Sequence, residues 1–162
     1  MQVDKTVILD LASSELEFFR SLKELVLRSA ELIKSENMEE LMPVLEGKQT
    51  MISKYKDILG EWNGIGLSLG LKVGYDDTDF RMQLFQALSN ELFEESSFFV
   101  KLKSIFEQIK TLAEESICIE DDSQEVLNEY VKRLRTRISQ VSKGRDACRG
   151  YASASGSSLY SR

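Results

Sequence analysis

The side chains that most often catalyse reactions or bind metals are few in this chain. Histidine is absent, which removes the usual proton shuttle and the commonest metal ligand. The only two cysteines, Cys118 and Cys148, lie 30 residues apart without a C-x-x-C partner. Each falls on the apolar side of its segment, so we interpret both as reduced core residues. The sequence therefore predicts no enzyme, no cofactor and no metal site.

Two short patterns resemble ligand sites but have simpler explanations. The cluster Asp76, Asp77 and Asp79 lacks the spacing and the closing glutamate of an EF-hand, so we interpret it, with Thr78, as the start of a helix. The glycines of Gly64-Ile65-Gly66 follow a predicted helix and not a strand, and no Walker lysine accompanies them. Neither pattern predicts a bound ion or phosphate.

Charge is divided unevenly along the chain. Residues 1–130 hold 13 basic and 26 acidic side chains, a balance of −13, whereas residues 131–162 hold 8 basic and 1 acidic, a balance of +7; together they give the net charge of −6. The cationic end has two explanations: an arm for nucleic acid, acidic lipid or an acidic protein surface, or a solvated helix face that complements the acidic body. Because the whole protein repels polyanions, we expect no nucleic-acid binding.

The apolar spacing predicts an all-α fold, an elongated antiparallel helical bundle built on a long helical hairpin with additional helices. The hairpin comprises helices over 6–34 and 38–62, with a bend or restart expected at Pro43 and Gly47. A third long helix is expected from near Thr78, and a fourth after the acidic break Glu120-Asp121-Asp122-Ser123. The apolar face of the first helix is wide enough to need two neighbours. The domain division is a helical bundle over 1–149 and a flexible C-terminal tail over 150–162.

Residues 60–74 are the only segment with strand-like alternation. Five of the nine glycines lie there, and Ile65, Leu67, Leu69, Leu71 and Val73 alternate with small or polar residues. One interpretation is a strand edge that pairs with a partner; the other is an extended connection that presses one set of side chains onto the helices.

The last helix and the tail contain the candidate binding residues. Leu127, Val131, Leu134 and Ile138 repeat at three and four positions and form a sparser stripe than that of the first helix, so we expect them to be available to a partner helix. Tyr151 follows Gly150 and lacks apolar neighbours at helical spacing, so we expect it to be exposed.

These features together resemble the FlgN family of flagellar export chaperones. The resemblance rests on the long first helix, on Glu46-Gly47-Lys48-Gln49 before Ile52, on a Leu-Gly-Leu turn at 69–71, and on a small, polar, tyrosine-containing tail. It covers nearly the whole chain.

The resemblance implies a cytoplasmic, non-enzymatic chaperone. Such a protein binds hook-filament junction proteins (hook-associated proteins) and delivers them to the type III export gate or its ATPase complex, with Tyr151 at the position of the family's gate-docking tyrosine. Asp10 interrupts the apolar run at 7–9, so we also expect no signal peptide and no membrane insertion. The alternative function is a structural, self-associating coiled-coil scaffold, and a homodimer is compatible with either.

Overall fold

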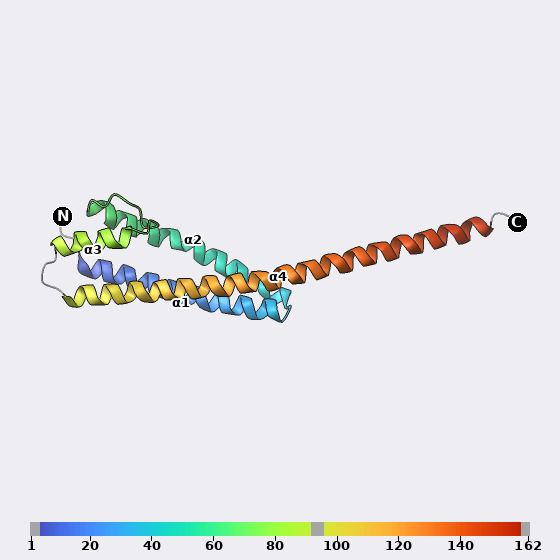
Figure 1. Ribbon diagram of the computed structural model, residues 1–162, viewed down its shortest axis with the longest axis horizontal. Helices are drawn as coiled ribbons and strands as arrows, with labels where there is room; N and C mark the ends of the chain where they lie inside the picture. Colours follow the sequence, from blue (N-terminus) through green and yellow to red (C-terminus); the bar gives the residue numbers. More distant parts are fainter. Residues whose placement is uncertain (1–3, 92–95, 160–162) are drawn as a thin grey trace.

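The computed structural model is an elongated all-α molecule that describes residues 4–91 and 96–159 (Figure 1). Its helices are α1 (Lys5–Lys34), α2 (Met38–Ser68), α3 (Phe80–Glu91) and α4 (Ser96–Leu159). The described ranges contain no β-strand. The predicted all-α class is therefore confirmed.

Side-chain caps begin both helices of the α1–α2 hairpin. The Asp4 carboxylate accepts a hydrogen bond from the backbone of Thr6 at 2.9 Å, and the Asn37 side chain accepts one from the backbone of Glu40 at 3.3 Å. The amide of Asn37 donates to the carbonyl of Leu32 at 2.9 Å, and Glu36 takes a left-handed conformation with φ 57°, which closes the end of α1. The tight reversal expected from the sequence is confirmed.

α2 is longer and more continuous than the sequence suggested. It runs to Ser68, with Pro43 and Gly47 inside it. The expected restart at these residues is wrong, since Pro43 removes only one amide donor and the rest of the helix is held by its own ladder and by packing.

The strand interpretation of residues 60–74 is also wrong. Residues 60–68 belong to α2, where Gly66 is needed because a Cβ there would lie 2.9 Å from the ring of Phe80. The chain then turns at Gly70, which has φ 74°. Between α2 and α3 the chain forms turns and bends and not an extended segment, but the side chains of Leu69, Leu71 and Val73 pack against the core, as the second interpretation expected.

α1 is the central helix and contacts both α2 and α4, as its wide apolar face predicted. It lies antiparallel to α2, so that Glu15 near its start meets Trp62 near the end of α2. It lies parallel to α4, because Arg20 meets Gln108 and, further along, Lys23 meets Glu115. This parallel pair departs from the antiparallel bundle predicted from the sequence.

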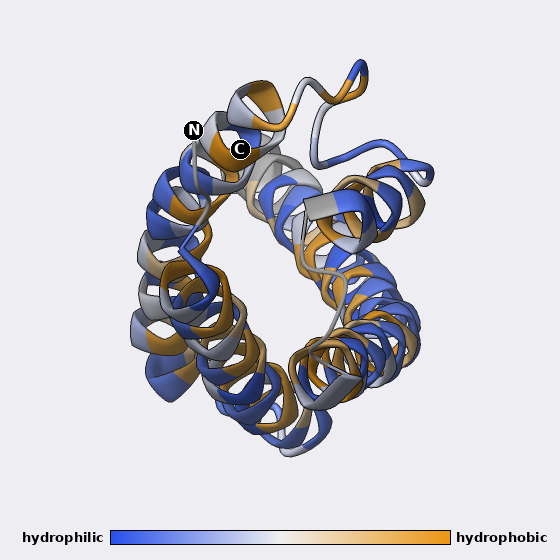
Figure 2. Ribbon diagram, turned by 90° about the vertical axis from the view of Figure 1, so that its left-hand side faces the viewer, coloured by the Kyte–Doolittle hydropathy of each residue, from blue (hydrophilic) through white to orange (hydrophobic). Residues whose placement is uncertain are grey.

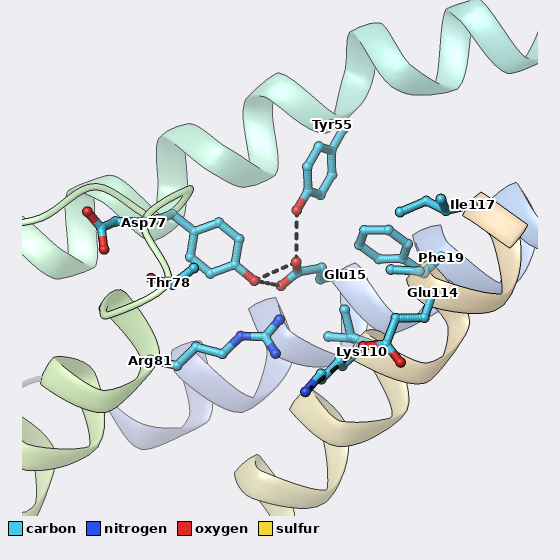
Figure 3. Close-up of a pocket in the computed structure, with 12 residues that line it drawn as sticks. Glu15, Phe19, Tyr55, Asp77, Thr78, Arg81, Lys110, Glu114 and Ile117 are labelled. Carbon is cyan, nitrogen blue, oxygen red and sulfur yellow. Dashed lines mark hydrogen bonds and ion pairs between the residues drawn. The ribbon is translucent and has the colours of Figure 1, made fainter. Parts of the chain in front are cut away.

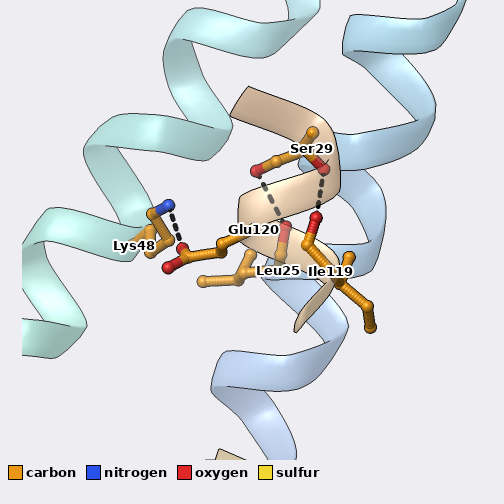
Figure 4. A network of polar contacts seen from close by, with 6 residues as sticks. Leu25, Ser29, Lys48, Ile119 and Glu120 are labelled. Carbon is orange, nitrogen blue, oxygen red and sulfur yellow. Dashed lines mark hydrogen bonds and ion pairs between the residues drawn. The ribbon is translucent and has the colours of Figure 1, made fainter. Parts of the chain in front are cut away.

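The helix boundaries after Thr78 differ from the prediction. The expected third long helix is divided into α3 and the first part of α4; residues 92–95, which the prediction placed within that helix, lie outside the described residues. The expected break at residues 120–123 is wrong, because α4 passes through it. There Glu120 forms an ion pair with Lys48 of α2 at 2.5 Å (Figure 4). Ser123 donates to the carbonyl of Ile119.

Two apolar clusters lie at opposite ends of the bundle. The larger contains Trp62, Phe80 and Leu102, all fully buried, and the smaller contains Leu32, Ile33, Leu41 and Val44 at the hairpin turn. Viewed along the molecule, the hydrophilic residues lie mostly on the outer sides of the helices (Figure 2). Beyond the turn, α4 projects alone (Figure 1). None of the described helices is both long and apolar enough to cross a membrane.

Candidate functional site

The candidate site is an apolar stripe on α4, which we call the seam. α4 carries no proline and reaches Gly144 before its first glycine, so its backbone stays helical across the stripe. Spacings of four and three residues place the side chains on one face of the helix. The seam consists of Leu127, Val131, Leu134, Ile138 and Val141.

Burial decreases along the seam as α4 leaves the bundle. Leu127 is partly buried and packs against the smaller apolar cluster. Val131 and Leu134 are half-buried, whereas Ile138 and Val141 are 68% and 57% exposed. Of the four predicted client-binding residues, Leu127 therefore serves mainly the fold, and Ile138 is the most accessible. The structure places the four on one face but does not enclose them in a groove.

An ion pair marks the place where α4 leaves the hairpin. Arg133 donates to the Glu36 carboxylate at 2.5 Å. Both side chains are about half exposed, so the pair contributes only modest stability. It also fixes the position of α4 at the point where the helix leaves the hairpin. Glu36 thus combines a left-handed backbone, where glycine is the usual residue, with a side chain that holds α4.

The projecting part of α4 is strongly cationic. Arg135 and Arg137 are exposed, and neither has an ion-pair partner among the described residues. They lie on the two sides of the seam, one residue after Leu134 and one residue before Ile138. The sequence had identified the charge, but its position beside the exposed seam, away from the acidic body, follows from the structure.

Tyr151 lies on α4 and is 80% exposed, which agrees with its predicted exposure. α4 does not end at Gly150, where the predicted tail begins, but continues to Leu159. Residues 160–162, including Tyr160, lie outside the described residues.

The interpretation of the cysteines as core residues is wrong. Cys118 and Cys148 are both free thiols and both exposed. Cys118 follows Ile117, which is itself 58% exposed, and Cys148 lies on the projecting part of α4. An apolar neighbourhood in sequence does not bury a side chain when no second helix covers that face.

A second polar cluster surrounds Glu15, a buried acid that the sequence did not single out. Its carboxylate accepts hydrogen bonds from Tyr55 Oη at 2.9 Å, from Trp62 Nε1 at 2.8 Å and from Tyr75 Oη at 2.5 Å. Burial, and then the charge of Glu15, raise the pKa of both tyrosines well above the usual value. The hydroxyl groups therefore stay protonated and donate to the carboxylate.

A cavity of about 520 Å³ adjoins this cluster (Figure 3). Phe19 and Ile117 line one side, while Arg81 and Lys110 bring positive charge to its wall. Arg81 also stacks over the Phe106 ring, with 4.6 Å from the guanidinium carbon to the ring centroid. The carboxylate oxygens of Glu15 already accept from Tyr55, Trp62 and Tyr75, so we assign the cluster a structural role. Its sequence signal was a lone acid on the apolar face of α1.

The described residues contain no group of three or more acids or cysteines placed to hold a metal ion. The fold and the site define an all-α protein with an exposed helical seam. No protein-family model, no curated protein and no solved structure matches this chain.

Proposed function

We propose that this protein is a non-enzymatic helix-binding chaperone that receives an amphipathic helix of its client along the seam of α4. We further propose, from the family resemblance, that its clients are flagellar hook-filament junction proteins. It would act in the cytoplasm and deliver them to the type III export gate or its ATPase complex.

The observation that carries this proposal is the exposure of Ile138 and Val141 on a helix that leaves the bundle. Two large aliphatic side chains on a lone helix face gain little from the fold itself, whereas a client helix that covers them would remove both from water. Anchors at three and four positions match the way in which amphipathic helices bind. Ordering a disordered client costs about 2–5 kcal/mol, which keeps the complex reversible, as export requires.

The direct test combines Leu134→Asp with Ile138→Asp. We expect this variant to lose at least tenfold in affinity for a purified junction protein, measured by titration calorimetry, because a buried carboxylate would have no partner. Thr136→Asp, on the exposed opposite face, is the control and should bind as the wild type does. If the double variant stays helical by circular dichroism and still binds the client, the binding surface lies elsewhere.

Tyr151 is the proposed docking residue for the gate. Its exposure of 80% supports an aromatic anchor on the surface. Tyr151→Ala should keep its melting temperature and its client yet lose binding to the cytosolic domain of the export gate. A variant that melts well below the wild type would instead show that Tyr151 is a packing residue.

A self-associating scaffold is the second candidate. Val131 and Ile138 are β-branched and alternate with Leu127 and Leu134, a composition that suits a two-stranded coiled coil. Light scattering over a concentration series separates the two functions: a scaffold forms dimers whether or not a junction protein is present, whereas a chaperone forms a defined complex with it.

A further inference from the structure

The seam follows the heptad repeat of a coiled coil. Val131 and Ile138 occupy a positions, and Leu127, Leu134 and Val141 occupy d positions. Continuing the register places Arg145 at the next a position. The seam therefore has the geometry for one partner helix, with a single cation within the contact stripe.

The width of the seam argues against a lipid surface. At 100° per residue its members fall within an arc of roughly 100°, about the width of a helix–helix contact. Helices that lie in a membrane interface carry a broad apolar face rich in Trp, Phe and Leu, whereas here Arg145 falls inside the stripe. A partner helix fits this face better than a bilayer does.

The residues beside the seam decide the charge of that partner. Arg135 is at an e position and Arg137 at a g position, where side chains of paired helices meet. Both are exposed, and no carboxylate in the described chain lies within ion-pair distance of either. From residue 131 to residue 152 the only acid is Asp146. Because the nearest opposite charges must come from the partner, acidic residues on the partner would complete these positions.

A second copy of this chain would pair poorly. A parallel dimer in register places Arg145 against its own copy in the contact stripe and brings together two arms of equal positive charge. The apolar seam alone would accept either a second copy of this chain or a different helix, and the charge beside the seam favours a different, acidic helix.

We infer that the occupant of the seam is an acidic amphipathic helix, which pairs with residues 127–148 of α4 as a two-stranded coiled coil and places carboxylates opposite Arg135, Arg137 and Arg145. This inference rests on the proposed function and adds the charge of the client helix. Specificity then arises from the e and g positions, and the apolar seam supplies most of the contact.

The test uses the full chain and two designed helical peptides of about four heptads. Both carry Val at a and Leu at d; the acidic peptide has Glu at e and g and Asp opposite Arg145, and the basic peptide has Lys at all these positions. Fluorescence anisotropy at low salt should give at least tenfold tighter binding of the acidic peptide. Arg135→Glu with Arg137→Glu should invert that preference.

The matched control is Lys132→Glu with Lys143→Glu. It makes the same change in net charge on exposed positions that face away from the seam, and should alter affinity less than about threefold. If circular dichroism shows loss of helix in the variant with Arg135→Glu and Arg137→Glu, the milder Arg137→Gln should still weaken binding of the acidic peptide. Equal binding of the two peptides, an unchanged preference in the reversed variant, or binding of phosphatidylglycerol vesicles in place of either peptide would overturn the inference.

Two outcomes separate this inference from the proposed function. If Ile138→Asp abolishes binding of a junction protein while the charge reversal has no effect, the charge inference falls and the helix-binding function stands. If Ile138→Asp leaves the junction protein bound, the proposed function falls with it.

Discussion

At the scale of single residues, Glu15 shows how the bundle holds a buried charge. It is the only acid among the buried residues of the described chain, with 1% of its surface exposed. Three donors from α2 and the α2–α3 connection meet its carboxylate, which offsets the loss of water. The cluster thereby ties α1 to α2 with directional bonds inside the larger apolar cluster.

Glu15→Ala should lower the free energy of unfolding by roughly 3 kcal/mol, because it leaves the hydroxyls of Tyr55 and Tyr75 and the indole of Trp62 without their acceptor. Urea denaturation followed by circular dichroism measures this loss. The control is Glu17→Ala, an exposed acid two residues away, for which we expect a change below about 0.5 kcal/mol. A small effect at Glu15 would mean that water replaces the carboxylate.

The pKa values of Tyr55 and Tyr75 predict a loss of stability in alkali. Both are raised by burial and by Glu15 above the value of about 10 that tyrosine has in the unfolded chain. A raised folded-state pKa contributes stability that is complete below pH 10 and is lost as the pH rises towards the folded pKa. The free energy of unfolding should therefore fall above pH ~10, and fall less steeply in the Tyr55→Phe, Tyr75→Phe variant. An unchanged slope in the double variant would contradict this prediction.

At the scale of elements, α4 is the feature that differs most from the sequence prediction. Four acidic or polar residues, 120–123, have the composition of a helix start, yet they lie within a continuous helix. Ion pairs before this segment and at its first residue, from Glu115 to Lys23 and from Glu120 to Lys48, hold α4 along the hairpin, and after the segment Leu127 packs against the smaller apolar cluster. The local preference of residues 120–123 for a helix start is weak compared with the tertiary packing that keeps α4 in one helix across them.

The two exposed cysteines provide a measurement of this continuity. Spin labels on Cys118 and Cys148 are separated by 30 residues of one helix, so we expect a single distance near ~45 Å at 1.5 Å per residue. Double electron–electron resonance measures it directly. A short or broad distribution would indicate that the helix breaks at residues 120–123, as the sequence alone had suggested.

At the scale of the whole molecule, the protein divides its chain between a packed bundle and a projecting arm. Both apolar clusters draw on residues up to Leu127, whereas the arm adds little buried surface. The arm also carries the positive charge, while the body is acidic. Stability therefore resides in the bundle, whereas the proposed partner binding resides in the arm.

A chain that ends at Arg137 should keep its stability and lose its partner. We expect its melting temperature to stay within about 4 °C of the full-length value, since residues 138–152, the deleted part whose burial the structure describes, are all exposed. Calorimetry of the two chains checks this. A chain that ends at Ile119 is the control: it also removes Leu127 and the Lys48–Glu120 pair and should melt clearly lower. Equal melting of all three chains would mean that the smaller cluster does not need α4.

The amino-acid sequence by itself determined the helical class, the hairpin and the residues of the seam. These follow from local causes: apolar spacing near 3.6 residues selects helices, Asp4 and Asn37 have side chains that accept from the first turn, and the seam repeats on one face whatever surrounds it. The same local reasoning predicted that Tyr151 would be exposed, because it has no apolar neighbours at helical spacing.

Only the tertiary structure decided which apolar or polar side chains are covered. Cys118 and Leu127 both follow helical spacing, but Leu127 lies over the hairpin turn and is partly buried, whereas no helix covers Cys118. Glu15 is buried because Tyr55, Trp62 and Tyr75, at least 40 residues away in sequence, converge on it. Burial depends on contacts between distant segments, so the spacing of residues along one segment does not predict it.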